Sequence, residues 1–212
     1  MSQRQRLGEV KIHSYIDQLV RSVGVRPLVS ERDLRKIYDS GDGGALVRYI
    51  ATTLKLRVSG LYLVNSGGPH NAVAWIANSH LIPLYGTPQF KDYKFDFFIR
   101  KSFIEDAPLE AISSGIAHEM CHIVMNALRH SLRHEEAAVD LMAMILGYRA
   151  LFCRGYRYEI RVETIEQALR LSKRLSRTPM IGDILESSLG YLYNDELVLA
   201  AQIIDAIFSR SR

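Results

Sequence analysis

The sequence predicts an α+β fold with N-terminal helices, a small antiparallel sheet in the middle and further helices to the end. Apolar residues repeat at helical spacing through residues 7–54, and short β-rich stretches bounded by turn residues fill residues 58–100. Helical patterns return after residue 106. We therefore expect an N-terminal helical region (1–54), a core region (55–152) and a C-terminal helical region (153–212), packed as one unit.

The N-terminal region should hold three helices. The spacing of its apolar residues predicts a helix over residues 7–23, which Gly24 would end. Ser30 can cap a second helix that runs to about residue 38, because its side chain can accept a backbone N–H of the first turn. A third helix is expected over residues 45–54.

The middle of the chain is rich in strand-forming residues. Residues 58–64 (VSGLYLV) and 71–77 (NAVAWIA) flank a loop of turn residues, which predicts a hairpin. Residues 93–100 (YKFDFFIR) form a third expected strand. The segment between these strands, residues 80–92, contains two prolines and a glycine and should be an irregular loop.

The C-terminal half reads as helical. Asp106 can cap a helix with Pro108 in its first turn, running to about residue 128. Ser131 would cap the next helix, over residues 132–152. Three more helices are expected over residues 162–175, 179–192 and 195–208, the last capped by Asn194.

The composition is typical of a soluble globular protein. Of the 212 residues, 48% are hydrophobic and 24% are charged, and the net charge of +4 permits an acidic partner without requiring one. The start resembles no signal peptide, and the longest apolar stretch, residues 141–152, is interrupted by Gly147 and Arg149. Two cysteines make no disulfide framework. We expect a cytoplasmic protein with no membrane partner.

The strongest functional signal is His118-Glu119-Met120-Cys121-His122, which reads HExxH. Two histidines four residues apart project from one face of a helix and can bind one Zn²⁺. Glu119 is rotated by about 100° from His118. It would therefore lie beside the metal, where it suits a general base acting on a water molecule.

A third ligand must come from elsewhere in the chain. Glu136 follows His122 by fourteen residues, and a helix break between them would let it face the histidines. Asp140 lies one turn further on the same face, where it could accept the second ring N–H of a ligating histidine. His130 and His134 form a second histidine pair, and either could replace Glu136 as the ligand.

Peptide hydrolysis would also need a donor to the oxyanion that forms on the carbonyl. The sequence offers several candidates without choosing among them, and the tyrosines among them could equally be core residues. The candidates are Tyr148, Tyr156, Tyr158, His130 and Arg149.

These motifs resemble the gluzincins, peptidases in which a downstream glutamate completes HExxH, and most closely the ImmA/IrrE-like family. In that family a short sheet precedes the HExxH helix, and the next helix carries a Glu-x-x-x-(Asn/Asp) pattern. The resemblance covers about residues 55–152 and implies a zincin-like fold with one Zn²⁺. The family roles fall on the zinc ligands His118, His122 and Glu136, the base Glu119 and the supporting carboxylate Asp140.

The chain departs from the family pattern at three places, one of which is the segment of residues 80–106, which is longer than the family pattern leads us to expect. Ala138 replaces the usual second glutamate, and Gly147-Tyr148 stands where the family has a closing proline. Members of the family typically make limited cuts in one regulatory protein, often a repressor, and some respond to single-stranded DNA. The resemblance therefore implies a zinc endopeptidase with a protein substrate, with single-stranded DNA as a candidate activator.

A second class of function follows from a basic helix face. Arg170, Lys173, Arg174 and Arg177 are spaced at i, i+3, i+4 and i+7, so they share one side of a helix. Such a stripe could hold the phosphates of a nucleic acid. The alternative to an endopeptidase is therefore a zinc-bearing, nucleic-acid-responsive sensor or binding protein without constitutive protease activity. A solvated face balanced by nearby glutamates is the other interpretation.

Overall fold

The computed structural model describes residues 6–65, 72–77, 82–172 and 178–210, and it confirms the α+β class. The three N-terminal helices form as predicted, as α1 (Glu9–Val23), α2 (Glu31–Asp39) and α3 (Gly43–Thr53). Gly24, at a positive φ of 67°, ends α1, and the Ser30 hydroxyl accepts the Asp33 N–H at the start of α2.

The three-stranded sheet consists of β1 (Val58–Val64), β2 (Ala74–Ile76) and β3 (Phe95–Arg100). The predicted hairpin is wrong, because β3 lies between the other two strands. The predicted antiparallel arrangement is wrong for one pair, since β1 runs parallel to β3 while β2 runs antiparallel to it. In β3, Phe95, Phe97 and Ile99 are buried, so alternate residues of this central strand face the core.

The HExxH helix is α6 (Leu109–Ala127), close to its predicted bounds. Its predicted start is wrong, because Asp106 ends a separate helix, α5 (Lys101–Asp106), and Pro108 takes the cap position of α6 without a side-chain cap. A further short helix, α4 (Pro88–Asp92), lies in the segment that was predicted to be irregular. The side chain of Thr87 caps it by accepting the Phe90 N–H.

The predicted single helix over residues 132–152 is interrupted. Residues 131–134 form turns, so Ser131 caps nothing, and the helix begins later as α7 (Glu136–Ala143). It continues through the π-helical turn η3 (Met144–Tyr148) into α8 (Arg149–Gly155). The connection between α1 and α2 explains the π-helical turn. Its backbone N–H groups at Arg26 and Val29 donate to the carbonyls of Ile145 and Gly147, which lie in that turn.

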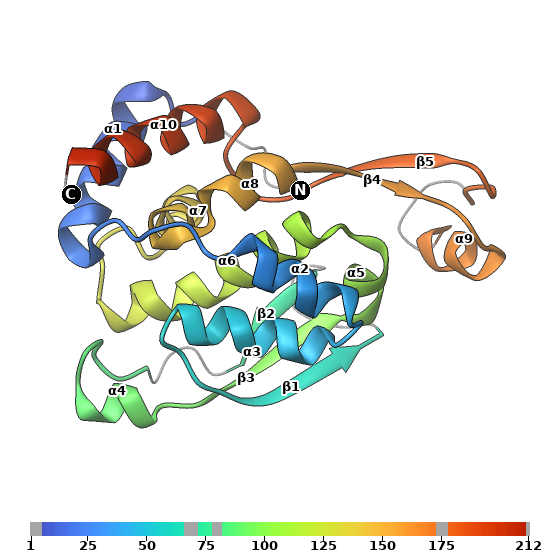
Figure 1. Ribbon diagram of the computed structural model, residues 1–212, viewed down its shortest axis with the longest axis horizontal. Helices are drawn as coiled ribbons and strands as arrows, with labels where there is room; N and C mark the ends of the chain where they lie inside the picture. The colour runs from blue at the N-terminus through green and yellow to red at the C-terminus, as the bar shows by residue number, and fades with distance from the viewer. Residues whose placement is uncertain (1–5, 66–71, 78–81, 173–177, 211–212) are drawn as a thin grey trace.

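The predicted helix over residues 179–192 is also wrong. This segment contains the strand β5 (Ile184–Ser188), which pairs antiparallel with β4 (Arg157–Arg161). Gly182, at a φ of 94°, turns the chain before β5 and cannot continue a right-handed helix. Together with α9 (Ile165–Ser172), the two strands project from the body as an arm (Figure 1). The last helix, α10 (Asn194–Arg210), confirms the final helix prediction, but the predicted cap is wrong, because Asn194 is the first helical residue and the Leu197 N–H donates to the carbonyl of Tyr193.

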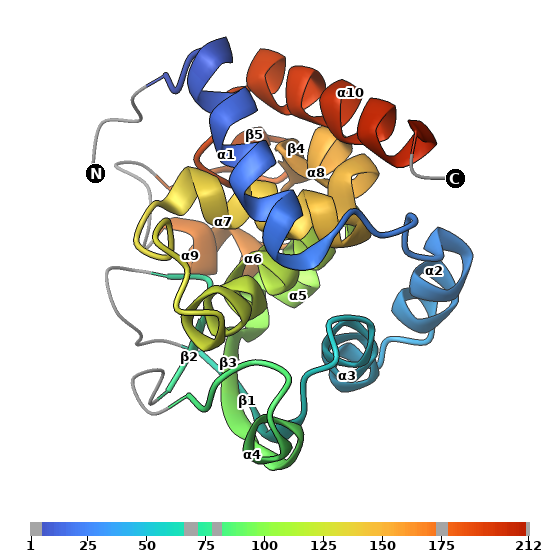
Figure 2. The same cartoon turned by 90° about the vertical axis from the view of Figure 1, so that its left-hand side faces the viewer.

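Helix α6 occupies the centre of the molecule. It packs against β2 and α3 on one side and against α7 and α8 on the other. Figure 2 shows α1 and α10 side by side, outside α7 and α8. One apolar core runs from Ile12 to Ile204, while the arm has a small cluster of its own around Val162, Ala168 and Leu171. None of the helices in the described ranges combines the length and apolar character that crossing a membrane requires.

Candidate metal centre

Helix α6 presents His118 and His122 on one face. The two residues are one helical turn apart, and their ring centroids lie 5.0 Å from each other with the ring planes nearly perpendicular. The His118 side chain is only 11% exposed and that of His122 is 24% exposed. The helix therefore holds both rings at the margin of the core, where their positions are restricted by packing.

Helix α7 supplies the third donor from its first residue. The Glu136 Oε2 atom lies 3.2 Å from His118 Nε2 and 3.4 Å from His122 Nε2. All three potential ligand atoms lie within 4.8 Å of one another, so this group could hold a metal ion. The helix break before α7 allows this approach, because it lets α7 return along α6 with Glu136 facing the histidines.

The alternative third ligands lie elsewhere. His130 is buried, and its Nδ1 atom accepts the backbone N–H of Leu132 at 3.1 Å. His134 is exposed in the turns before α7. Among the described residues, the group that could hold a metal contains Glu136 and neither of these histidines.

Asp140 supports the ligand His118, as the spacing predicts. Its Oδ1 atom lies 2.7 Å from His118 Nδ1, and its side chain has no exposed surface. The other oxygen, Oδ2, accepts the backbone N–H of Tyr191 at 2.6 Å and that of Leu192 at 3.4 Å. The carboxylate thus fixes the orientation of the His118 ring while its own position is fixed by the segment before α10.

The carboxylates around the histidines favour positive charge at this place. Burial lowers the pKa of His118, but hydrogen bonds with Asp140 and Glu136 outweigh it and raise this pKa to about 10. Burial likewise opposes ionisation of Glu136, but hydrogen bonds with His118 and His122 hold its pKa well below the usual range. Both pKa shifts therefore favour a positive charge between the two carboxylates.

Glu119 lies beside this group and outside it. Its carboxyl is largely buried, and burial raises its pKa, while the nearby imidazoles of His118 and His122 lower it and Glu136 raises it again. The charges of all three potential ligands therefore affect the ionisation of this carboxyl. A carboxylate that is close to a metal centre but holds none of its positions can move a proton.

The donor set fits a metal such as zinc. Two imidazole nitrogens and one carboxylate oxygen are a ligand combination found at catalytic zinc sites, where three protein ligands leave a fourth position for water or substrate. The Glu136 side chain is 41% exposed, so the group is open to solvent on the side of α7. The arrangement can therefore bind a metal and admit a further molecule.

The residues predicted as oxyanion donors lie in the core and in the arm. Tyr148 is fully buried, and its hydroxyl is hydrogen-bonded to that of Thr53 in α3. Arg149 is buried and its Nε atom donates to Asp205 at 2.6 Å. Tyr156 is buried at the end of α8. Tyr158 lies on β4, in the arm.

A residue that the sequence did not indicate lies against His118, one of the potential metal ligands. The ring of Tyr191 stacks on that of His118, with centroids 5.6 Å apart and an angle of 22° between the planes. Residues 179–192 were predicted to be a helix, so the loop that carries Tyr191 was not foreseen. Gly190 was the available signal for a turn there, but no spacing connects it with His118.

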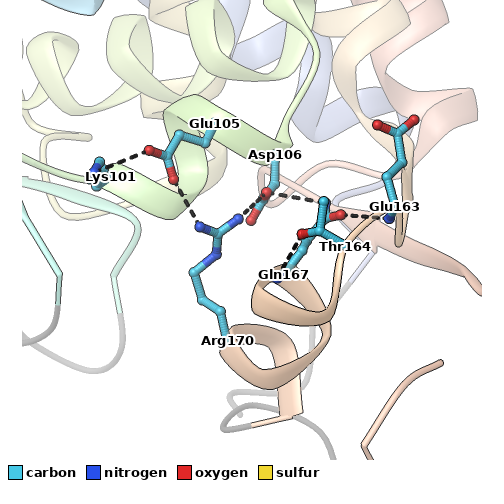
Figure 3. Close-up of polar contacts among 7 residues, drawn as sticks. All are labelled: Lys101, Glu105, Asp106, Glu163, Thr164, Gln167 and Arg170. Atoms are coloured by element: carbon cyan, nitrogen blue, oxygen red, sulfur yellow. Dashed lines mark hydrogen bonds and ion pairs between the residues drawn. The ribbon is translucent and has the colours of Figure 1, made fainter. Parts of the chain in front are cut away.

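The basic stripe is described only at Arg170. This guanidinium donates to Glu105 at 2.9 Å and to Asp106 at 2.6 Å, joining α9 to the end of α5 (Figure 3). Gln167 donates to the same Asp106 oxygen at 3.2 Å. Arg170 thus serves an internal ion-pair network. The other members of the stripe, Lys173, Arg174 and Arg177, lie outside the described residues.

Searches of protein-family models, curated proteins and solved structures find no significant match to this chain. The residues of the candidate metal centre and their geometry are therefore what indicates a function.

Proposed function

We propose that this protein is a zinc-dependent endopeptidase that makes limited cuts in a regulatory protein, such as a transcriptional repressor, in the cytoplasm. The observation that supports the proposal most strongly is the convergence of His118, His122 and Glu136 within 4.8 Å, with Glu119 beside them. The resemblance to ImmA/IrrE-like peptidases at the same residues supports the class of substrate.

Zinc is the metal that suits these donors best. Imidazole nitrogens with a single carboxylate oxygen favour a borderline metal over magnesium or calcium, which prefer sites made of oxygen ligands. The orientation of His118 by the buried Asp140 is also common around zinc, where it fixes the tautomer of the ligand.

Bound zinc would supply Lewis acidity toward a water molecule and toward the scissile carbonyl. Glu119 takes the proton from the attacking water and delivers it to the departing amine. Its largely buried carboxyl favours this exchange, because burial raises its pKa and makes it a better proton acceptor. His118, His122 and Glu136 hold their positions throughout, since helices α6 and α7 carry them.

The sheet offers a way to hold an extended substrate. β2 is an edge strand and packs against α6, whereas β3 is central. A peptide added alongside β2 would pair through its backbone and lie near the helix of the histidines. This mode of binding selects a flexible, extended segment of a protein, which suits limited cutting.

The proposal is tested by comparing protein N-termini by mass spectrometry in host cells that carry the chain or its Glu119→Gln variant, with and without DNA damage. New N-termini that occur only with the unmutated chain would establish the peptidase and identify its substrate. Identical profiles under both conditions would overturn the proposal.

Two controls make the comparison specific. Purified Glu119→Gln should keep its zinc, because Glu119 is not a ligand; loss of zinc would show that its role is misassigned. Glu135→Gln provides a matched variant, since Glu135 is exposed and its side chain makes no cap hydrogen bond. This variant should produce the same N-termini as the unmutated chain.

A further inference from the structure

The segment of residues 189–193, here called the strap, connects β5 to α10 and passes over the metal centre. Its backbone N–H groups at Tyr191 and Leu192 donate to Asp140 Oδ2, while Asp140 Oδ1 holds His118. One buried carboxylate therefore joins the strap to a metal ligand. Nothing in the HExxH motif or the following helix requires such a connection.

Gly190 permits the strap to approach this closely. Its φ is +76°, a conformation that other residues rarely adopt, and a Cβ atom at this position would lie 3.0 Å from Asp140 Oδ2. Any side chain here would have to displace the carboxylate or the strap. The close approach thus depends on glycine for two independent reasons.

The strap is held at both ends. The Leu189 N–H donates to the carbonyl of Tyr156 at 3.0 Å, at the end of α8. The Tyr193 N–H donates to Glu196 Oε2 at 2.9 Å, and Glu196 Oε1 accepts the Leu7 N–H at 2.6 Å. The position of the strap is therefore set by α8, by α10 and by the segment before α1.

Tyr191 adds a second contact to the same ligand. Its ring stacks on that of His118 while remaining 43% exposed to solvent. His118 is consequently held along one ring edge by Asp140 and across one face by Tyr191. The tyrosine forms a wall of the metal centre that a substrate beside His118 would meet.

We propose that the strap is a positioning element of the metal centre: it holds Asp140 through two backbone N–H groups and the His118 ring through Tyr191. Metal binding and ordering of the strap are then coupled, and each strengthens the other. This inference rests on the zinc centre of the proposed function and is independent of the cleavage reaction.

The test measures zinc affinity by competition with a chromophoric chelator in the full chain. Gly190→Ala should weaken zinc binding by about 10-fold or more, the effect typical of disturbing a residue that orients a metal ligand. Gly182→Ala is the matched control, because Gly182 also has a positive φ but has no atom within 4 Å of a built Cβ. It should bind zinc as the unmutated chain does.

Tyr191 variants keep the test decisive if Gly190→Ala folds poorly. Tyr191→Ala should weaken zinc binding, because it removes the stacked ring. Tyr191→Phe keeps the ring and should bind zinc as the unmutated chain does. Hydrogen exchange should also show the Tyr191 and Leu192 amides becoming more protected when zinc is added, while the Gly182 turn stays unchanged.

The outcomes separate this inference from the proposed function. If the unmutated chain binds zinc and neither Gly190→Ala nor Tyr191→Ala alters its affinity, the strap has no positioning role, whether or not the protein cuts a substrate. If the unmutated chain binds no zinc, both proposals are overturned. If the strap variants lose zinc affinity as expected and no cleavage is found, the positioning role of the strap is supported and only the peptidase proposal fails.

Discussion

Asp140 Oδ1 lies 2.7 Å from His118 Nδ1 and its side chain has no exposed surface, so a residue of the core determines which way a potential metal ligand points. The same carboxylate accepts two backbone N–H groups of the segment before α10. Changes at Asp140 should therefore affect two properties that can be measured separately, namely zinc affinity and stability.

Asp140→Asn should weaken zinc binding by about 10- to 100-fold, because the neutral amide orients and polarises His118 less strongly. Asp140→Ala should in addition lower the free energy of unfolding by about 1–3 kcal/mol, since it leaves the buried N–H groups without their acceptor. Chelator competition and urea unfolding measure the two effects. Unchanged zinc affinity in Asp140→Asn would contradict the orienting role.

Glu136→Gln should reduce zinc affinity much more than Glu135→Gln. Glu136 places a carboxylate oxygen 3.2 Å from His118 Nε2, whereas the neighbouring Glu135 is exposed and stands outside the group. Elemental analysis after dialysis measures the zinc content of the two variants. Each variant replaces one glutamate by glutamine, so the two change the net charge equally. If Glu136→Gln retained stoichiometric zinc, Glu136 would not be a required ligand, and His130 or His134 would have to be considered as the third ligand instead.

Arg170→Ala should lower the free energy of unfolding by about 1–3 kcal/mol, because Asp106 is then left with its charge poorly compensated. The Asp106 side chain is only 5% exposed, and Arg170 donates to it at 2.6 Å. Arg35→Ala is a suitable comparison, since Arg35 is 49% exposed in its pair with Glu110 and should contribute less than about 1 kcal/mol.

The loss in Arg170→Ala should also depend on pH. Burial already raises the pKa of Asp106, and the Arg170 charge opposes this effect, so removing Arg170 raises the folded-state pKa further. A carboxyl with a raised folded-state pKa destabilises the protein when it is ionised, and this penalty disappears as the pH falls below its unfolded pKa. Urea unfolding at neutral and acidic pH should show the difference between Arg170→Ala and the unmutated chain shrinking in acid.

Tyr148→Phe should leave zinc affinity and cleavage unchanged and should cost about 1 kcal/mol of stability. The Tyr148 hydroxyl is buried and bonded to that of Thr53, so the variant removes an internal hydrogen bond. Thermal unfolding and the N-terminal profile measure the two properties. A strong loss of cleavage in a folded, zinc-loaded variant would instead make Tyr148 the oxyanion donor.

Local sequence determined the elements whose signals lie within a few residues of one another. Apolar spacing predicted α1, α2, α3, α6 and α10 nearly at their observed bounds, although the caps predicted for α6 and α10 are wrong. The His118 and His122 pair was equally predictable, because the helical period alone places residues four apart on one face. The α+β class followed from the order of these local patterns.

Tertiary structure decided what depends on contacts between distant segments. β3 became the central strand through its pairing with both β1 and β2, and strand order cannot be deduced from strand propensity. The helix predicted over residues 179–192 became β5 and the strap, because pairing with β4 and the contact with Asp140 outweighed local helical preference. Glu136 was selected over His130 and His134 by the place where α7 begins.

The sequence by itself therefore determined the chemistry offered by α6, since a single helix holds those side chains in register. Only the tertiary structure decided how that chemistry is supported: Asp140 bonded to the strap, Tyr191 stacked on His118, and Arg170 paired with Asp106. These relationships join residues separated by 51 or more positions. Their energies come from burial and hydrogen bonding that exist only after the chain has folded.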